Sequence, residues 1–473
     1  MKNVIWWIRR DIRLQDNSAL QEAMAQSSHI LPLYIFDPNL LAHKAEHRKA
    51  FLFEALTGLD HELRRMGSHL VVMSGHPLEV LKTVIAQSGA EAIFAEADYS
   101  PYARQRDQKV AKELPIWLVH GLTVFPPGMV VKNSGCPYTV YLPFNRAWKG
   151  LPHPALNTAK RSELRIHPLP ENAPHGELIP QLTPNPAFPA SAAEAHRRLK
   201  AFIAGPVYEY EENRNRLDIQ GTSLLSPYMR FGLISSHDVV DAAECAIQNA
   251  PDETSRKNAE AWMNELIWRE FYISVLHHFP EVLESSFRKD LRGIRWRNEP
   301  TDFRSWRDGQ TGYPVVDAAM RQLKQTGWMH NRTRMIVASF LVKDLLVTWQ
   351  EGEAWFMENL VDGDPASNNG GWQWTSGVGT DAVPYFRIFN PVLQGEKFDP
   401  EGTFVKQWLP ELKDVPAEYI HKPWVMGDVE QKAYGVKLGE NYPKPIVDHS
   451  IVKQRTMAAF DTGEARSVIE GCR

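Results

Sequence analysis

One short stretch, Asp362 to Trp374, combines two aspartates, three carboxamide side chains, a Gly-Gly turn and two indoles. It ends a segment from Trp262 to Trp374 that holds nine of the fifteen tryptophans. Indoles are easily oxidised, and Asp and Asn side chains bind polar ring edges, so this composition favours a flat, redox-active ligand. The alternative is a Trp-rich core, because tryptophan is heavily buried in most globular proteins.

A second set of reactive side chains follows helical spacing. Glu265, Trp268, Arg269 and Tyr272 lie on one face of a predicted helix, and Trp262 precedes them on the same helix. A carboxylate framed by indoles is costly to bury. The alternative is an exposed Glu-Arg pair of the ordinary i,i+4 kind, worth a few tenths of a kcal/mol.

A third set lies at the start of another predicted helix. Asn331, Arg334 and Met335 are spaced i, i+3 and i+4, so a carboxamide, a cation and a thioether face one way. Arg334 pairs either with Asp362 or with Asp364 near the ligand, or else it lies on the domain surface.

A fourth set consists of hydroxyls and main-chain N–H groups. The segment Gly221 to Pro227 has three hydroxyl side chains at the start of a predicted helix. Such a helix start binds phosphate groups, although an ordinary N-cap has the same composition.

The first ~130 residues predict the elements that position these groups. Short β-rich runs alternate with amphipathic segments such as Arg48 to Met66, which indicates a parallel sheet with helices on both faces. The chain has no Gly-x-Gly-x-x-Gly after the first strand and no P-loop. Charged residues from Arg9 to Asn17 follow the first strand, at the sheet edge where α/β proteins bind ligands. The predicted strands are Asn3 to Ile8, Ile30 to Phe36, His69 to Met73, Ala92 to Ala95 and Ile116 to Val119.

Seven prolines between Pro168 and Pro189 predict a non-helical linker. After it, helical patterns cover Glu260 to His278, Val315 to Thr326 and Asn331 to Trp349. We therefore expect a Rossmann-like α/β domain over residues 1–130, a linker over 131–195 and an all-α domain over 196–473.

Composition restricts the class of protein. A net charge of −4 argues against indiscriminate coating of nucleic acid. The run Arg288 to Arg297 is either a solvated charged face or a surface that follows phosphates. No apolar run is long enough to cross a bilayer, and the spacing of Cys136, Cys245 and Cys472 matches neither a disulfide-rich scaffold nor zinc ligands. We expect a cytoplasmic monomer without a metal site or a membrane partner.

Long motifs in consistent order resemble the photolyase/cryptochrome flavoproteins over nearly the whole chain. They are Trp7 to Leu14, Gly221 to Ser223, Trp262 to Tyr272, Thr311 to Leu323, Gly327 to Arg332 and Asn369 to Trp374. Within the family the chain resembles the class I cyclobutane pyrimidine dimer (CPD) photolyases. The resemblance implies an α/β antenna domain, a helical domain that binds FAD, and light-driven splitting of pyrimidine dimers in UV-damaged DNA.

The resemblance also assigns residues to the cofactor. Asn368 corresponds to the position opposite the flavin N5, where Asn is typical of repair enzymes. Met335 also favours CPD repair, because enzymes for (6-4) photoproducts have a histidine-bearing motif there. The implied FAD ligands are Tyr210, Thr222, Ser223, Leu224, Leu225, Ser226, Trp262, Arg269, Arg334, Asp362, Gly363, Asp364 and Asn368.

Further residues are assigned to the lesion and to electron transfer. The resemblance implies that Glu265 and Asn331 bind the thymine carbonyls, that Trp268 and Trp374 flank the dimer, and that Met335 belongs to the same catalytic set. The resemblance also implies that the dimer is flipped out of the duplex, which costs less than flipping a normal base because a dimer stacks and pairs poorly. The implied DNA-binding residues are Glu265, Trp268, Arg269, Tyr272, Asn331 and Arg332, and the implied electron-transfer chain is Trp372, Trp349 and Trp296.

An antenna chromophore is also implied. Tyr102-Ala103 replaces the Asn-Glu pair of folate-binding relatives, which favours 8-hydroxy-deazaflavin or a second flavin over folate, and an empty antenna site is the remaining alternative. Asp37, Arg48 and Asp98 are the predicted antenna residues.

Two other functions fit the same resemblance less well. A cryptochrome-like blue-light photoreceptor would not need the repair-type residues Glu265, Asn331, Met335 and Asn368, and we expect no long signalling tail after Arg473. A flavin oxidoreductase for small molecules would leave the lesion-facing residues without a role.

Overall fold

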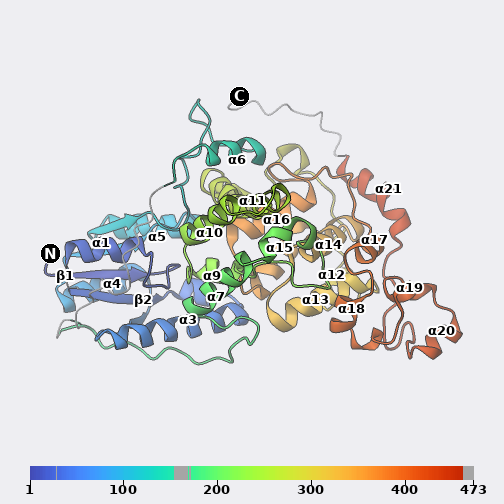
Figure 1. The fold of residues 1–473 in the computed structure, drawn as a ribbon, viewed down its shortest axis with the longest axis horizontal. Helices are drawn as coiled ribbons and strands as arrows, with labels where there is room; N and C mark the ends of the chain where they lie inside the picture. The colour runs from blue at the N-terminus through green and yellow to red at the C-terminus, as the bar shows by residue number, and fades with distance from the viewer. Residues whose placement is uncertain (28, 154–168, 170–171, 462–473) are drawn as a thin grey trace. The chain divides into compact units, whose positions relative to one another are not determined.

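Five β-rich runs form one sheet whose neighbouring strands are all parallel, in the order β3-β2-β1-β4-β5 (Figure 1). The predicted parallel sheet is therefore confirmed. β3 begins two residues later than predicted, because the Leu70 N–H donates to Asp60 Oδ1 instead of to a strand. The strands are β1 (Asn3–Ile8), β2 (His29–Phe36), β3 (Val71–Ser74), β4 (Ala92–Glu96) and β5 (Ile116–Val119).

Helices cover both faces of this sheet. Every residue of β1 from Val4 to Ile8 is buried, which requires cover on both sides because successive side chains point to opposite faces. Ile5 and Trp7 share one core cluster with side chains of α4 and α5. The helices of this region are α1 (Ser18–Gln26), α2 (Pro38–Leu41), α3 (Glu46–Arg65), α4 (Pro77–Ser88) and α5 (Pro101–Ala111).

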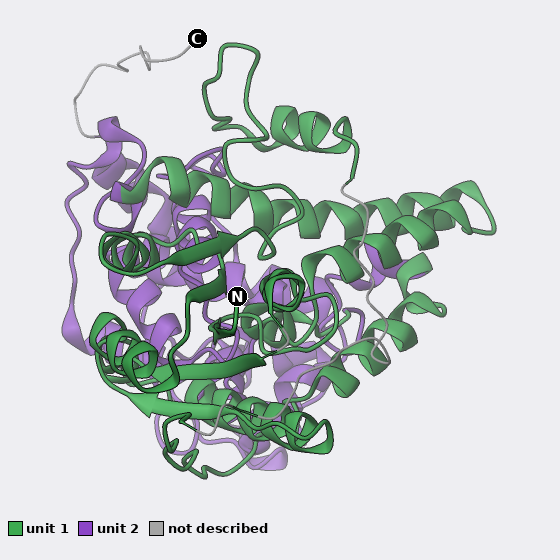
Figure 2. Cartoon of the chain, turned by 90° about the vertical axis from the view of Figure 1, so that its left-hand side faces the viewer, with its two compact units in different colours: residues 1–208, 223–280 green, residues 209–222, 281–473 purple. Residues whose placement is uncertain are grey.

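The structure is a computed structural model, which describes residues 1–27, 29–153, 169 and 172–461. It divides into two compact units, residues 1–208 with 223–280 and residues 209–222 with 281–473 (Figure 2). The boundaries predicted at residues 130 and 195 come from changes in sequence pattern, whereas the two units are defined by which residues pack together. These boundaries therefore stay predictions. Pro168, Pro170, Cys472 and Arg473 lie outside the described residues.

The first unit continues beyond the sheet as helices. α11 begins well before the predicted Glu260, because Asp252 caps it by accepting a hydrogen bond from the Ser255 N–H at 2.8 Å. The remaining elements are α6 (Tyr141–Lys149), α7 (Ala192–Ile203), the 3₁₀ turn η2 (Pro206–Glu209) at the unit boundary, α9 (Ser226–Phe231), α10 (Ser236–Gln248) and α11 (Glu253–His278).

The described part of the proline-rich segment is not helical, as predicted, and it runs beside β3. The Glu177 N–H donates to Val72 O at 2.7 Å, and the Glu177 carboxylate accepts from the N–H and the hydroxyl of Ser74. These bonds attach the linker to the edge of the sheet.

The second unit has no β-strand among its described residues and packs around one apolar core, which confirms the all-α prediction for the second half of the chain. Its α-helices are α8 (Tyr210–Asn213), α12 (Pro300–Arg307), α13 (Pro314–Thr326), α14 (Asn331–Ser339), α15 (Trp349–Asn359), α16 (Pro365–Ser376), α17 (Pro391–Phe398), α18 (Thr403–Trp408), α19 (Ala417–Ile420), α20 (Asp428–Ala433) and α21 (His449–Phe460). The other helical turns are η3 (Pro280–Leu283), η4 (Lys289–Leu291), η5 (Phe340–Asp344), η6 (Pro410–Leu412) and η7 (Pro423–Val425).

The prediction of one helix from Asn331 to Trp349 is wrong. α14 ends at Ser339, a π-helix follows over Phe340–Asp344, and a new helix begins at Trp349. Leu346 has a left-handed φ of 52°, and its carbonyl accepts the N–H of Arg297 at 2.8 Å instead of a helical N–H. The apolar period continues through this break, which is why the sequence pattern did not reveal it.

A buried carboxylate fixes the start of α13. Asp317, which is fully buried, accepts hydrogen bonds from the N–H and hydroxyl of Thr311, both at 2.7 Å, and from the Gly312 N–H at 3.0 Å. The Tyr442 hydroxyl donates to the same carboxylate at 2.8 Å. Asp317 therefore joins the turn before α13 to a segment more than a hundred residues later in the chain.

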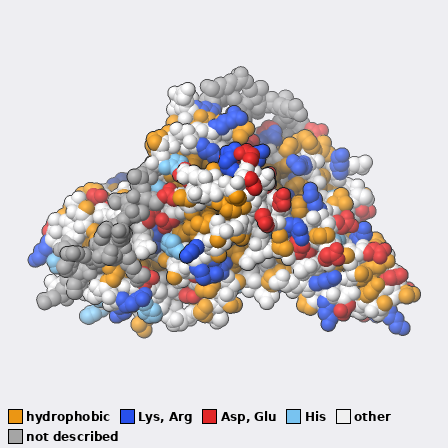
Figure 3. All heavy atoms as spheres, viewed as in Figure 1, with side chains coloured by type: hydrophobic (Ala, Val, Ile, Leu, Met, Phe, Trp, Pro, Cys, Tyr) orange, Lys and Arg blue, Asp and Glu red, His pale blue; other side chains and the backbone are white. Residues whose placement is uncertain are grey.

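Charges of both signs are mixed on the surface of the second unit. On the face shown in Figure 3, Lys and Arg side chains lie beside Asp and Glu. Two such pairs are Arg321–Glu411 at 2.7 Å and Lys422–Glu396 at 2.9 Å. In the described part of the chain, no helix is long and apolar enough to cross a membrane.

Candidate functional site

Helix α11 carries the first group of predicted site residues. Glu265, Trp268, Arg269 and Tyr272 are all partly buried on it. Trp268 stacks on Tyr141 of α6, with ring centroids 3.6 Å apart and planes 7° from parallel, and lies 5.4 Å from the Tyr272 ring. The predicted helix is thus confirmed, and Tyr141 is a neighbour that the sequence analysis missed.

Trp262 and Arg269 of α11 also have contacts within the first unit. Trp262 is buried and packs against Phe202 with centroids 5.0 Å apart. Arg269 Nη1 donates to Leu122 O at 3.3 Å and to Ser236 Oγ at 3.1 Å. These bonds orient the Arg269 guanidinium, and its assignment to FAD and DNA stays a prediction.

The hydroxyl-rich turn is divided by the boundary between the units. Gly221 and Thr222 belong to the second unit, where a side chain at Gly221 would collide with the Asn213 carbonyl. In the first unit, Leu224 has a left-handed φ of 52° and Leu225 occupies the cap position of α9 without a side-chain cap bond. The ordinary N-cap alternative therefore does not describe α9, which begins with Ser226.

In the second unit, the start of α14 holds four predicted residues. Asn331 is exposed and Met335 is partly buried. His330 caps the helix, with Nδ1 accepting the Arg332 N–H at 3.1 Å. Burial and the nearby Arg332 and Arg334 lower the pKa of His330 to about 4, so this imidazole is neutral at pH 7.

Arg334 pairs with Asp362, which decides between the two partners considered from the sequence. Arg334 Nη2 lies 2.8 Å from Asp362 Oδ2, and Arg334 Nε donates to Met329 O at 2.9 Å. The other carboxylate oxygen, Asp362 Oδ1, is buried and has no hydrogen-bond partner among the described residues. A buried acceptor of this kind is costly unless a ligand donates to it.

Asp364 and Asn368 have different structural roles. Asp364 caps α16, its Oδ1 accepting the N–H groups of Ala366 and Ser367 at 3.0 and 3.1 Å. Asn368 is buried, and its Nδ2 donates to Glu353 O of α15 at 3.0 Å. Since the amide nitrogen is used in this way, the Asn368 Oδ1 is oriented away from Glu353. Gly363 lies between the two aspartates, in the turn that leads into α16.

Glu353 is a titratable residue beside this group that the sequence analysis missed. Its Oε1 accepts from Asn369 Nδ2 at 3.5 Å, and burial raises the pKa of Glu353 to about 7. The i,i+4 spacing from Trp349 was a signal in the sequence that places both on one face of α15.

We expect the Glu353→Gln variant to be more stable than the parent protein at pH 8, by about 1–2 kcal/mol. The unfolded glutamate has a pKa of about 4.3, so the folded parent binds an extra proton as the pH falls through 7. The parent's free energy of unfolding therefore rises towards low pH, while glutamine imitates the protonated form throughout. Urea unfolding at pH 8, 6.5 and 5 should show the difference shrinking towards zero, and exposed Glu358→Gln in the same helix is the control. A difference that does not change with pH contradicts this assignment.

The three tryptophans predicted to transfer electrons all lie in the second unit. Trp372 and Trp349 are buried, whereas Trp296 is partly buried, 5.8 Å from the Phe460 ring. Trp372 packs on α15 where Gly352 has no side chain, three residues after Trp349. Trp306, which the prediction left out, lies 6.1 Å from Trp372.

Trp374 is partly buried on α16, two residues after Trp372. The two indoles are therefore on different sides of this helix. This suits the separate roles predicted for them, electron transfer for Trp372 and contact with the dimer for Trp374.

A cluster of arginines surrounds Arg332. Its Nε and Nη2 donate to Asn215 Oδ1 at 3.1 and 2.6 Å, and its guanidinium lies 4.7 Å from the Phe398 ring centroid. Burial lowers the pKa of Arg332, and so does repulsion from Arg214 and Arg387. Because the three arginines are far apart in sequence, no local pattern predicted this cluster of positive charge.

The basic run from Arg288 to Arg297 is partly neutralised. Arg288 pairs with Asp290 at 2.5 Å, and Arg297 lies 3.5 Å from Asp302. Arg292 Nε donates to Ser286 O. Of the two alternatives, the contacts favour the solvated charged face.

The predicted antenna residues lie in the first unit. Asp37 caps α2 and accepts a hydrogen bond from the Tyr102 hydroxyl, and Asp98 lies 3.7 Å from Arg10. Arg48 lies in α3. Near the end of β1, the Trp7 ring lies 4.8 Å from each of the guanidinium groups of Arg9 and Arg106. This edge of the sheet is thus rich in charge and aromatic surface.

Two family models match the chain. The family described as "DNA photolyase" matches residues 4–170, and the one described as "FAD binding domain of DNA photolyase" matches residues 262–462. The relatives named deoxyribodipyrimidine photo-lyase include a bacterial and an archaeal protein. The Escherichia coli protein is 40% identical over 96% of this chain and 98% of its own, and the Halobacterium salinarum protein is 39% identical over 97% and 98%.

Solved structures resemble this chain over almost its whole length. A class III photolyase from Agrobacterium tumefaciens has a TM-score of 0.90 with 37% identity, covering 97% of both chains. A Synechocystis cryptochrome has a TM-score of 0.87 with 28% identity, covering 97% of this chain and 99% of its own. A Sulfolobus tokodaii photolyase with two FAD molecules has a TM-score of 0.82 with 29% identity and the same coverage.

Proposed function

The chain belongs to the photolyase/cryptochrome family, and from this premise we propose how its residues repair DNA. The activity is that of a deoxyribodipyrimidine photo-lyase, which splits cyclobutane pyrimidine dimers with light. The chemistry that reduced FAD would supply when bound is the absorption of light and the electron for opening the cyclobutane ring. The protein has to hold the cofactor, hold the lesion and exclude water.

The single observation that carries this proposal furthest is the buried Asp362 beside Arg334. Asp362 Oδ1 is a buried acceptor without a partner among the described residues, and the flavin ring and ribityl chain offer N–H and O–H donors. Arg334 supplies positive charge at the same point, which suits an anionic reduced flavin. Asn368, held by its Nδ2, presents its carbonyl oxygen as a further acceptor.

The lesion-facing roles remain as the resemblance assigns them. Glu265 and Asn331 hydrogen-bond the thymine carbonyls, Trp268 and Trp374 flank the dimer, and Met335 belongs to the same catalytic set. The partial exposure of Glu265 and Trp268 and the exposure of Asn331 support these roles, because groups that contact DNA need to be accessible.

The purified protein should split dimers in DNA only under near-UV or blue light. The measurement is the restoration of intact thymines within a dimer-containing oligonucleotide after reduction of the flavin, with a sample kept in darkness as the control. Equal conversion in darkness would exclude the photo-lyase. Light absorption without repair would instead favour the photoreceptor alternative.

We also propose that the arginine cluster binds the DNA backbone. Arg332→Ala should weaken binding of undamaged and damaged duplex alike, and should reduce the slope of log Kd against log salt by about 1. The matched control is Arg304→Ala, an exposed arginine of α12 outside the cluster. A salt slope identical to the parent's would remove Arg332 from the phosphate contacts.

The finer assignments are part of the same proposal. We place the chain in class I on its motifs, although a class III enzyme is 37% identical to it. For the antenna we favour 8-hydroxy-deazaflavin or a second flavin, which is supported by the two FAD molecules of the Sulfolobus tokodaii photolyase. We further propose a cytoplasmic monomer, since the interaction partner is DNA and the cysteines are few and widely spaced.

A further inference from the structure

One face of helix α6 packs along α11 throughout its length. Near its start, the Tyr141 ring stacks on Trp268; one turn later, Phe144 packs on Phe271 with centroids 5.3 Å apart. At its end, Trp148 Nε1 donates to Glu270 Oε2 at 2.7 Å. This i, i+3, i+7 spacing fixes the orientation of α6, and with it the position of Tyr141.

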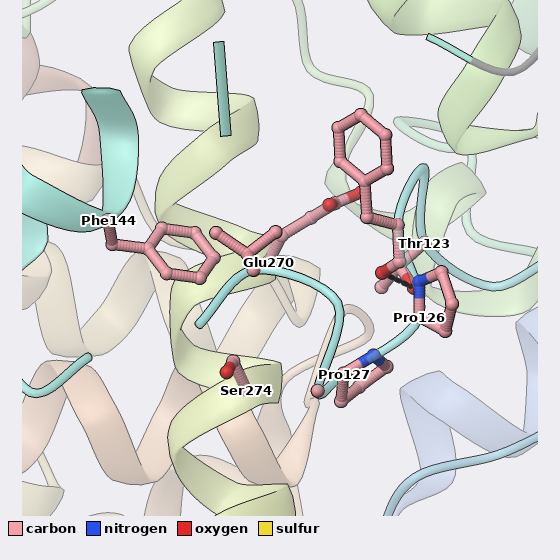
Figure 4. A pocket seen from close by; sticks show the side chains of 9 residues that line it. Thr123, Pro126, Pro127, Phe144, Glu270 and Ser274 are labelled. Atoms are coloured by element: carbon pink, nitrogen blue, oxygen red, sulfur yellow. Dashed lines mark hydrogen bonds between the residues drawn. The ribbon is translucent and has the colours of Figure 1, made fainter. Parts of the chain in front are cut away.

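Glu270 joins α6 to the loop before it. Its carboxylate is buried, accepts the Trp148 indole N–H and also accepts the Val124 N–H. Figure 4 shows Glu270 and Phe144 beside a small pocket that Thr123, Pro126, Pro127 and Ser274 also line. Because both carboxylate oxygens are used, α6 is held to α11 by polar bonds as well as by apolar packing.

The stack of Tyr141 on Trp268 is closer and more nearly parallel than most aromatic pairs. Such pairs prefer offset or edge-on arrangements with centroids roughly 4.5–7 Å apart, whereas these are 3.6 Å apart with planes 7° from parallel. A face-to-face pair needs other contacts to maintain it.

Polar groups hold the far end of the Tyr141 ring. Its hydroxyl donates to Asn264 O at 2.7 Å and accepts from Asn145 Nδ2 at 2.9 Å. The Asn264 side chain in turn accepts from Asn145 Nδ2 and from Lys149 Nζ, both at 2.9 Å. Tyr141 is therefore fixed at its hydroxyl and covers one face of the Trp268 indole, while Trp268 remains partly exposed.

We propose that Tyr141 is a positioning residue that holds the Trp268 indole in the plane required for stacking on a flipped pyrimidine dimer. The proposal rests on the proposed function, in which Trp268 faces the lesion. Stacking of a base on an aromatic side chain contributes about 1–3 kcal/mol, and a ring that is already oriented loses less entropy on binding. Tyr141 itself does not touch the lesion.

The test compares Tyr141→Leu, Tyr141→Phe and Trp268→Leu in the protein that retains its flavin. In darkness, Tyr141→Leu should raise the Kd for dimer-containing duplex by roughly fivefold to tenfold, and Tyr141→Phe, which keeps the ring but loses its hydroxyl bonds, by less. The Kd for undamaged duplex should stay within about twofold of the parent's. The repair yield per photon at saturating lesion concentration should not change, because Tyr141 affects binding only. The matched control is Leu142→Ala, which changes an exposed side chain next to Tyr141 in the sequence.

Three outcomes separate this proposal from the function on which it rests. If Trp268→Leu loses lesion affinity and Tyr141→Leu, with an unchanged flavin spectrum and melting temperature, does not, the positioning role is wrong. If Tyr141→Leu weakens lesion and undamaged DNA equally, the role is structural and the proposal is again wrong. If the parent protein fails to repair dimers under light, the proposed function itself fails, whatever the variants do.

Discussion

Replacing Trp372 with phenylalanine is expected to slow the photoreduction of oxidised flavin by roughly tenfold or more, while repair by the pre-reduced enzyme stays close to normal. Phenylalanine is much harder to oxidise than tryptophan, so the variant lacks an electron donor but still fills most of the space. Trp372 is buried, 5.0 Å from the Phe356 ring, and packs against α15 at Gly352. Absorption spectra recorded during timed illumination measure the rate of flavin reduction directly.

The neighbouring indoles make this experiment more informative. The resemblance predicts transfer from Trp349 to Trp372, but the structure also places Trp306 6.1 Å from Trp372. Trp306→Phe and Trp349→Phe are therefore the matched variants. The variant with the slower flavin photoreduction identifies which indole passes the electron to Trp372. Loss of repair in pre-reduced Trp372→Phe, with normal flavin content, would show that this indole serves the lesion or the fold and not photoreduction.

The largest expected effect on stability comes from Asp317→Ala. Four donors converge on this carboxylate, from Thr311, Gly312 and Tyr442. Burial raises the pKa of Asp317 to about 6, so the charged form is itself costly, but removing the carboxylate leaves buried donors without an acceptor. We expect a loss of about 3–5 kcal/mol in the free energy of unfolding.

Urea unfolding at pH 7.5 measures this loss. The control is Asp308→Ala, a more exposed carboxylate that pairs with Arg307 at 3.2 Å and should change stability by less than about 0.5 kcal/mol. Tyr442→Phe removes one donor and should cost about 1 kcal/mol. An Asp317→Ala variant as stable as the Asp308→Ala control would show that these hydrogen bonds do not hold the C-terminal segment.

Local patterns predicted the elements and the residues that depend on helical or strand period. All five strands and the helix of Glu265 to Tyr272 follow from spacing of a few residues, whereas the pairing of Arg334 with an aspartate 28 residues away is one of the alternatives that the sequence leaves open. The choice of Asp362 over Asp364 does not follow from spacing, because Asp364 is needed as the cap of α16 and only the three-dimensional path of the turn shows this.

Residues brought together from distant parts of the chain could not be predicted in the same way. The Arg214, Arg332 and Arg387 cluster and the stack of Tyr141 on Trp268 arise from tertiary packing, and neither leaves a period in the sequence. The roles towards FAD and DNA came from the family resemblance, since spacing predicts proximity but does not identify a ligand.

The π-helix at Phe340–Asp344 and the break after it uncouple the helical registers of the two ends of this region. In an uninterrupted α-helix, each inserted residue turns everything beyond it by about 100°, which would rotate Trp349 away from Trp372 whenever the Asn331 end changed length. A wider turn absorbs one extra residue, and the break at Leu346 ends the helical register altogether. The positions of the buried indoles Trp349 and Trp372 therefore do not depend on helical register with Asn331.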